Sequence, residues 1–207
     1  MDQDLQDLNT REISMDDAER EIDIYLEKVQ DFLNTGELRM HPKLYMRAYT
    51  LIVRLSDEYD KSEDIYQIYE ERLLKHILIR VIPLLQQSTG DSAQFLKQYN
   101  IQFKKFTFMV YTMNKIFYYL DKYFLKNALK MSLSEKALDL YRSQVFDKYL
   151  DHLRRSIFEE IRKDREDEIV DKGELKSSIL QFIYMGFNEK VVLKKIEDLA
   201  DPITWTC

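Results

Sequence analysis

The stretch 103–125, FKKFTFMVYTMNKIFYYLDKYFL, constrains the fold of this chain more than any other segment. One set of its side chains recurs at steps of three and four residues, the spacing of one helix face. That set is Phe103, Phe106, Val110, Met113, Phe117, Leu120 and Phe124. A second set faces another way: Phe108, Tyr111, Thr112, Lys115 and Tyr119. A helix that is apolar on more than one side is buried on several sides or docks to a partner.

Turn-forming residues are scarce in the rest of the chain, with 4 Gly and 3 Pro in 207 residues. Sheet-rich folds need many turns, so this composition favours long helices. The 45% of hydrophobic residues is enough for a substantial core, and no segment shows strand alternation between turn signals. We therefore predict an all-α fold of six or seven long antiparallel helices packed as a bundle.

Capping residues place the first helices. Ser14 is expected to begin a helix that Gly36 ends, and Pro42 lies in the first turn of a second helix that runs to about residue 58. A third helix begins at Ser62 and is expected to kink or break near residue 82, because Pro83 cannot donate a backbone hydrogen bond.

The later boundaries follow from the same signals. Helical periodicity continues from about residue 92 to 128, with a possible break near Tyr99–Asn100. Ser132 or Ser134 caps a helix that reaches residue 161, and the charge run 162–168 is expected to be a solvated turn. A further helix at 174–184 stops at Gly186, and a short one covers 188–199. The predicted organisation is a mobile acidic lead-in (1–13), a helical domain (14–199) and a tail or truncated start of a further repeat (200–207).

Charge and cysteine usage exclude several classes of protein. The net charge of −6 argues against a general nucleic-acid binder, and residues 1–35 alone hold 11 acidic and 3 basic side chains. The acidic start does not resemble a signal peptide, and no run approaches the roughly 20 apolar residues of a membrane span. The single cysteine, Cys207, fits a reducing compartment, so we expect a cytoplasmic or nuclear protein.

Residue constellations for catalysis or metal binding do not occur. His41, His76 and His152 are far apart and have no cysteine companions, and the four glycines are isolated, so no phosphate loop is formed. We predict no cofactor, no metal and no enzymatic activity, and we interpret the chain as a binding or scaffold module.

The helix at 42–58 carries a surplus apolar face. A stripe of Leu44, Ala48, Leu51 and Leu55 already satisfies its core side. Tyr45, Met46 and Tyr49 lie on other positions, and they are either additional core or an interface, since Tyr and Met are enriched in interface cores.

Three phrases, in order, match the pattern of a known family. LYMRAYTLIVRL (44–55) matches at Tyr45, Met46, Tyr49 and Thr50. The stretch 103–125 matches at Phe106, Phe108, Asn114, Ile116, Tyr119, Leu120 and Asp121. The segment 138–186 matches at Arg165, Ile169, Asp171 and Gly186. With these spacings, residues 15–195 resemble the N-terminal region of a cullin, the scaffold subunit of cullin–RING ubiquitin ligases.

The chain departs from the family pattern at three positions. Phe103 stands near the place of a family Trp, Asp167 replaces the Gly of a turn, and Lys115 replaces a small residue in the helix that would face the adaptor.

The resemblance implies a first cullin repeat that acts in ubiquitin-dependent degradation within an SCF-like complex. Its partner would be a BTB-fold, Skp-type adaptor, which brings a substrate receptor. The implied adaptor-binding residues are Tyr45, Met46, Tyr49, Thr50, Phe108, Tyr111, Thr112 and Lys115. Nothing here resembles the C-terminal cullin domain, so a RING subunit is implied only if the parent protein has that domain. The alternative is a helical-repeat tethering or trafficking subunit that binds a helical partner.

Overall fold

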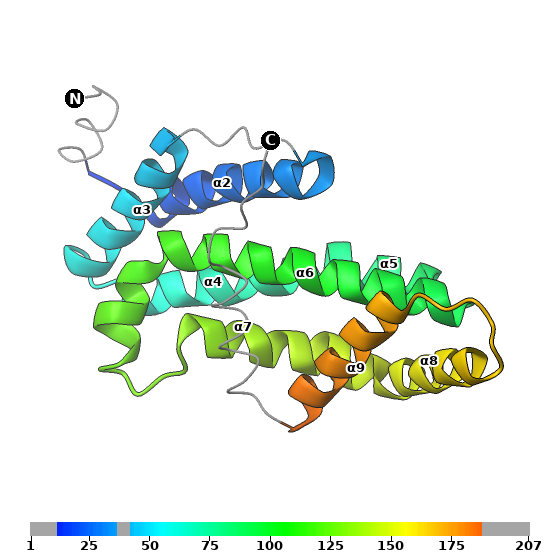
Figure 1. The fold of residues 1–207 in the computed structure, drawn as a ribbon. Coiled ribbons are helices and arrows are strands. Elements are labelled where there is room, and N and C mark those ends of the chain that lie inside the picture. The colour runs from blue at the N-terminus through cyan, green and yellow to red at the C-terminus, as the bar shows by residue number, and fades with distance from the viewer. Residues whose placement is uncertain (1–11, 37–41, 188–207) are drawn as a thin grey trace. The chain divides into compact units, whose positions relative to one another are not determined.

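The computed structural model describes residues 12–36 and 42–187, and within these ranges every regular element is a helix (Figure 1). The α-helices are α2 (Met15–Thr35), α3 (Pro42–Asp57), α4 (Ser62–His76), α5 (Ile82–Gln87), α6 (Ser92–Ile116), α7 (Leu133–Tyr141), α8 (Asp147–Arg165) and α9 (Lys172–Phe187). Three π-helical turns are η1 (Ile77–Val81), η2 (Leu120–Leu125) and η3 (Arg142–Phe146). The predicted all-α fold is confirmed.

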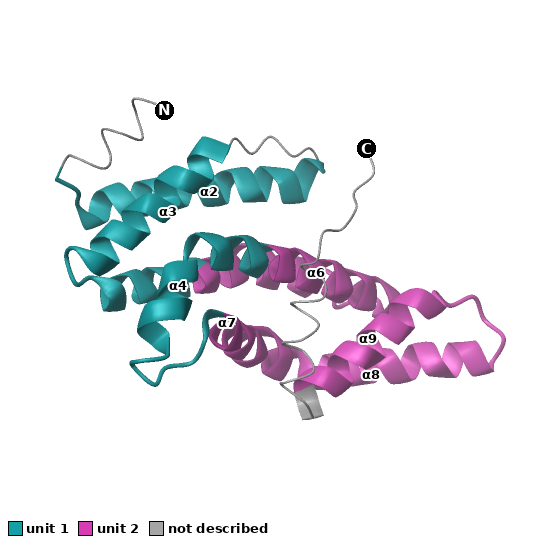
Figure 2. Cartoon of the chain, turned by 60° about the vertical axis from the view of Figure 1, so that its left-hand side comes forward, with its two compact units in different colours: residues 1–72, 109–133 teal, residues 73–108, 134–207 magenta. Residues whose placement is uncertain are grey.

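The chain divides into two compact units, coloured separately in Figure 2. The first unit comprises residues 1–72 and 109–133, and the second comprises residues 73–108 and 134–207. Both α4 and α6 cross a boundary between the units, so the C-terminal part of α6 belongs to the first unit and its longer N-terminal part to the second.

Helix α2 begins and ends where the sequence predicts. Ser14 forms a capping box with Asp17, since each backbone N–H donates to the other residue's side chain at 3.1–3.2 Å. At the C-terminal end Gly36 adopts φ 73° and its N–H donates to the Phe32 carbonyl at 2.8 Å. This left-handed conformation carries no steric penalty for glycine, which explains why the helix stops there.

Ion pairs join α2 to its neighbours in the first unit. The almost fully buried carboxylate of Glu21 accepts a hydrogen bond from Arg47 Nε of α3 at 3.0 Å. Arg72 of α4 donates to Glu19 and Asp23 of α2, each at 2.7 Å. Because the buried Glu21 charge is matched by Arg47, the desolvation penalty is offset and α3 is held on α2.

Two buried tyrosines link the remaining helices of the first unit. The Tyr25 hydroxyl of α2 donates to the Thr112 carbonyl of α6 at 3.4 Å. The Tyr69 hydroxyl of α4 lies 2.8 Å from Asn114 Oδ1 and 2.9 Å from the Leu133 carbonyl oxygen. Burial raises the pKa of both tyrosines, so each hydroxyl stays protonated and serves as a donor inside the core.

The core of the second unit is aromatic. The Tyr141 ring of α7 lies 5.2 Å from Phe103 and 4.7 Å from Phe106 of α6, between ring centroids. A polar network lies beside these rings: Asn100, which is fully buried, donates to the Glu174 carbonyl at 2.9 Å and accepts from Gln181 Nε2 at 2.7 Å. These bonds fix α6 to α9 and give both ends of the buried Asn100 amide a partner.

The structure differs from two predicted helix breaks. The break near Tyr99–Asn100 is wrong, because the partners of Asn100 on α9 stabilise it within a continuous α6. The break at Pro83 lies one turn earlier than predicted, at η1, where the Ile82 N–H donates to the Ile77 carbonyl five residues back. This wider turn leaves Pro83 in the first turn of α5, where its missing N–H costs nothing.

The charge run at 162–168 is partly helical rather than a turn. Arg162 pairs with Glu159 and Glu166, at spacings of three and four residues, and α8 continues to Arg165. The turn follows at Asp167, whose φ of 59° lies in the left-handed region that favours glycine.

Helix α9 begins before the predicted residue 174 and extends past Gly186. The Asp171 carboxylate accepts from the N–H groups of Gly173 and Glu174, both at 3.0 Å, and so caps the start of the helix. The predicted helix at 188–199, the tail at 200–207 and almost all of the lead-in at 1–13 lie outside the described residues and stay predictions.

Candidate functional site

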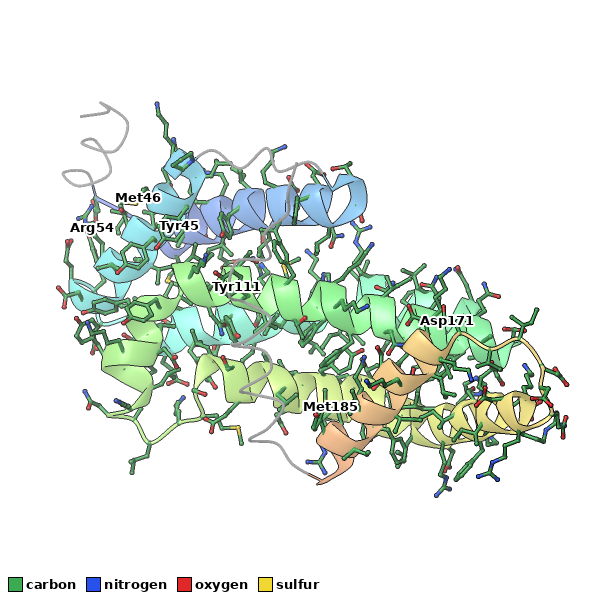
Figure 3. All side chains as sticks on the ribbon, in the orientation of Figure 1. Tyr45, Met46, Arg54, Tyr111, Asp171 and Met185 are labelled. Atoms are coloured by element: carbon green, nitrogen blue, oxygen red, sulfur yellow. The ribbon has the colours of Figure 1, made fainter. Side chains whose placement is uncertain are left out.

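The four predicted residues on α3 lie off its buried face. Ala48, Leu51 and Leu55 are buried, which confirms the predicted core stripe apart from the half-buried Leu44, and Ile52 is buried as well. Tyr45, Tyr49 and Thr50 are half-buried, and Met46 is exposed at 42%. Figure 3 labels Tyr45 and Met46 on α3 and Tyr111 on α6. The Tyr45 and Tyr49 rings are stacked, with centroids 5.8 Å apart and planes 14° apart.

The predicted residues on α6 do not share one environment. Tyr111 is half-buried and Lys115 is exposed, with its Nζ 4.2 Å from the centre of the Tyr111 ring. Thr112 is 4% exposed, and its hydroxyl donates to the Met109 carbonyl at 2.8 Å. The Thr112 side chain therefore belongs to the core of the first unit, and its inclusion in an exposed surface is corrected. The helical rotation could not be fixed to one residue from the sequence pattern.

Phe108 is half-buried and belongs to the second unit. The other predicted residues belong to the first unit, so the candidate site described below is built from the first unit alone.

Residues 118–123 add to this surface and were not predicted as site residues. Helix α6 ends at Ile116, and a turn at Phe117 precedes η2. The Tyr119 hydroxyl then donates to Asp57 Oδ1 at the end of α3, at 2.9 Å. Tyr118 and Tyr123 are 52% and 50% exposed. The high density of tyrosine in this segment is a signal for a binding surface in the sequence. The predicted continuous helix from about residue 92 to 128 did not include the turn that brings these residues to α3.

We call the resulting region the tyrosine surface. It comprises Tyr45, Met46, Tyr49 and Thr50 of α3, Tyr111 and Lys115 of α6, and Tyr118, Tyr119, Lys122 and Tyr123 of the following segment.

Ring contacts and electrostatics show that the tyrosines of α3 lie close to the segment 118–123. The Tyr119 and Tyr123 ring centroids are 4.8 Å apart, and Lys122 Nζ lies 5.0 Å from the Tyr123 ring centre. Burial raises the pKa of Tyr49, and the nearby hydroxyls of Tyr45 and Tyr123 raise it further, whereas Lys122 opposes the shift. Tyr49 therefore connects the stacked pair on α3 to the segment 118–123.

The chemistry of this surface suits binding more than reaction. It combines phenol rings, a thioether and ammonium groups, which contribute large apolar area with polar edges, as interface hot spots do. Within residues 12–36 and 42–187, no three histidine, cysteine or acidic side chains gather as metal ligands would. None of the helices in the same residues has the length and apolar character needed to span a bilayer.

The second unit has a hollow of about 650 Å³ between the start of α6 and α8. Much of its charged lining is paired: Arg162 with Glu159 and Glu166, and Lys163 with Glu160 at 2.7 Å. Arg155, also in the lining, donates to the Asp151 carbonyl at 3.3 Å.

Comparisons with known proteins agree with the motifs in the sequence. The family model of the Cullin alpha solenoid domain matches residues 20–198. The chain is similar to Cullin-1 of Oryza sativa subsp. japonica, with 26% identity over 145 residues, which cover 69% of this chain and 19% of that protein. It is also similar to Cullin-like protein 3 of Arabidopsis thaliana, with 24% identity over 163 residues, which cover 79% of this chain and 62% of that protein.

The chain thus spans less than two thirds of the length of either relative. The matched domain nevertheless extends over most of the chain, from within α2 to beyond the end of α9. The all-α architecture, the ordered motifs and the domain match lead to one conclusion: this chain belongs to the cullin family.

Proposed function

We propose that this protein is a non-catalytic scaffold module of a cullin–RING ubiquitin ligase, and that its tyrosine surface binds a BTB-fold, Skp-type adaptor. The adaptor would bring a substrate receptor, so that the module serves ubiquitin-dependent protein degradation. A RING subunit would join through a C-terminal cullin domain of the parent protein. We also propose a cytoplasmic or nuclear location, which rests on the family and on the use of a single cysteine.

The observation that carries the proposal is the exposure of aromatic side chains on the first unit. Met46, Tyr118 and Tyr123 are each 42–52% exposed, and Tyr118 and Tyr123 lie near the half-buried Tyr49, whose ring stacks on Tyr45. A cluster of this kind is more apolar than ordinary protein surface and marks an interaction site. Membership of the cullin family makes an adaptor the preferred occupant over the helical partner of a tethering subunit, since no described feature favours tethering.

The energetic argument concerns Tyr45 and Met46. Both side chains lie outside the buried stripe of α3, so the fold does not depend on them to the extent that it depends on Leu51 or Leu55. A partner that covers them would remove apolar area from water, worth roughly 25 cal/mol per Å². Truncating a central aromatic anchor of an interface costs about 2 kcal/mol or more in binding free energy.

The experiment measures binding of a purified Skp-type adaptor encoded by the same genome, by isothermal titration calorimetry. We expect the wild-type chain to bind, and the double variant Tyr45→Ala/Met46→Ala to lose at least about thirty-fold in affinity. The matched control is Tyr184→Ala/Ile183→Ala on α9 of the second unit, which changes a similar amount of half-buried and exposed surface.

Circular dichroism and thermal unfolding establish that each variant is folded before binding is compared. A folded Tyr45→Ala/Met46→Ala variant with wild-type affinity would contradict the assignment of the site. Absence of binding by the wild-type chain would contradict the proposed function itself.

A further inference from the structure

Two lysines on the tyrosine surface have aromatic neighbours but no acidic partner in the described part of the chain. Lys115 Nζ lies over the Tyr111 ring at 4.2 Å, and Lys122 Nζ lies 5.0 Å from Tyr123 and 5.9 Å from Tyr118, measured to ring centres. Both lysines are exposed. Such contacts hold the ammonium group by cation–π attraction and leave its charge facing solvent.

The nearby carboxylates are engaged elsewhere. Asp57 accepts from the Tyr119 hydroxyl at 2.9 Å, and Glu58 is paired with Arg54 at 2.6 Å. Asp121 accepts from the backbone N–H of Leu133 at 3.1 Å. These three carboxylates therefore do not pair with Lys115 or Lys122, and the two lysines give the tyrosine surface a positive charge.

This arrangement contrasts with that of three other cations of the first unit. Arg47 pairs with Glu21, Arg72 with Glu19 and Asp23, and Lys130 with Glu63. The same chain holds an excess of acidic residues, with a net charge of −6. An acidic protein that keeps two cations unpaired on one aromatic surface has a surface complementary to negative charge.

We propose that the segment of the adaptor that binds the tyrosine surface is acidic as well as apolar, with carboxylates that pair with Lys115 and Lys122. This inference rests on the proposed function, because it specifies the chemistry of the partner for the same surface. The aromatic rings supply apolar contact area, and the lysines select among adaptors by charge and accelerate association.

The experiment compares charge-reversal and neutral variants in binding to the purified Skp-type adaptor from the same genome, at 50 and 300 mM NaCl. We expect Lys122→Glu and Lys115→Glu each to lower affinity about five- to ten-fold at the lower salt concentration, mainly through the association rate. Lys122→Gln is expected to lose only about two- to three-fold, because it removes an attraction without adding a repulsion. The losses shrink at 300 mM NaCl, since salt screens exposed charges.

The matched control is Lys104→Glu, which makes the same change of charge at an exposed position of α6 in the second unit. If Lys115→Glu and Lys122→Glu bind the adaptor as Lys104→Glu does, the acidic-partner inference is overturned, whereas adaptor binding by the wild type still supports the proposed function. If the wild-type chain does not bind the adaptor at either salt concentration, the proposed function falls and this inference falls with it.

Discussion

The two units use the same kind of side chain in opposite ways. In the second unit, Tyr141 packs 4.7 Å from Phe106 and 5.2 Å from Phe103, and all three rings are buried. In the first unit, Tyr119 and Tyr123 approach equally closely, at 4.8 Å, yet Tyr123 is half exposed. Ring–ring contact therefore does not by itself distinguish a core from a binding surface.

The difference lies in the elements that cover the rings. Helix α7 covers the aromatic face of α6 in the second unit, whereas no described element of the first unit covers Tyr118 or Tyr123. Rings that pack only against one another and against lysine stems retain apolar area for a partner. The comparison leads to predictions in which core substitutions cost folding free energy and surface substitutions do not.

The largest expected effect is that of Tyr141→Ala. It removes a fully buried ring and leaves a cavity beside Phe103 and Phe106, so the free energy of unfolding should fall by about 3–5 kcal/mol. Chemical denaturation followed by circular dichroism measures it. Tyr123→Ala is the counterpart on the tyrosine surface and should cost less than about 1 kcal/mol. An equal loss of unfolding free energy in the two variants would contradict the distinction between the buried rings and the tyrosine surface.

A somewhat smaller loss is expected for Asn100→Leu. The substitution leaves Gln181 Nε2 and the Glu174 carbonyl without their buried partner, at a cost of about 2–4 kcal/mol. Asn127→Leu is the control, because Asn127 is exposed and donates to the Tyr123 carbonyl at 2.9 Å within one turn. Denaturation of both variants should show a near-neutral effect for the control, and a near-neutral Asn100→Leu would contradict the role of the network.

The buried histidine of the second unit predicts a pH dependence. Burial, together with the charges of Arg80 and Lys105, lowers the pKa of His76 from 6.5 to about 4. Below pH 6.5 the unfolded chain therefore binds a proton that the folded chain does not, so this contribution to stability is lost as the pH falls from about 6.5 to 4. The loss is roughly 3 kcal/mol and levels off below pH 4.

His76→Leu should flatten that dependence, as measured by urea unfolding at several pH values. His152, whose pKa is also lowered by burial, is present in both proteins, so the difference between them isolates His76. An unchanged pH dependence in His76→Leu would show that the second unit tolerates a charge at this position.

The smallest expected effect concerns the link between Tyr119 and α3. Tyr119→Phe removes one exposed hydrogen bond to Asp57 and should lower the free energy of unfolding by about 0.5 kcal/mol or less. Thermal unfolding provides the measurement, with Tyr69→Phe as the buried counterpart, which should cost about 1–2 kcal/mol. A larger loss for Tyr119→Phe than for Tyr69→Phe would contradict the surface character of residues 118–123.

Local signals in the sequence accounted for much of the fold. Ser14, Gly36 and Ser62 lie at the predicted helix ends, because capping acts through side chains and backbone angles of adjacent residues. The break at Phe117 and the continuity of α6 through Asn100 were not predictable in this way. Both are accompanied by contacts between residues distant in sequence, of Tyr119 with Asp57 in the first case and of Asn100 with α9 in the second.

Only part of the candidate site could be predicted, because the rest of it depends on contacts between residues distant in sequence. Periodicity identified the outer face of α3, but a rotation of one residue on α6 decides whether Thr112 or its neighbour faces solvent, and the pattern permits both. Tyr118, Lys122 and Tyr123 join the surface because the chain turns after Ile116, which requires knowledge of the tertiary fold.

Oxidative footprinting of the adaptor complex tests the central claim most directly, because it reads side-chain exposure residue by residue. Met46, Tyr118 and Tyr123 should become protected when the purified Skp-type adaptor binds. Met131 and Phe158, which are 53% and 64% exposed but lie outside the tyrosine surface, should keep their reactivity. Protection of Phe158 together with unchanged reactivity at Met46 and Tyr123 would contradict the assignment of the tyrosine surface as the adaptor site.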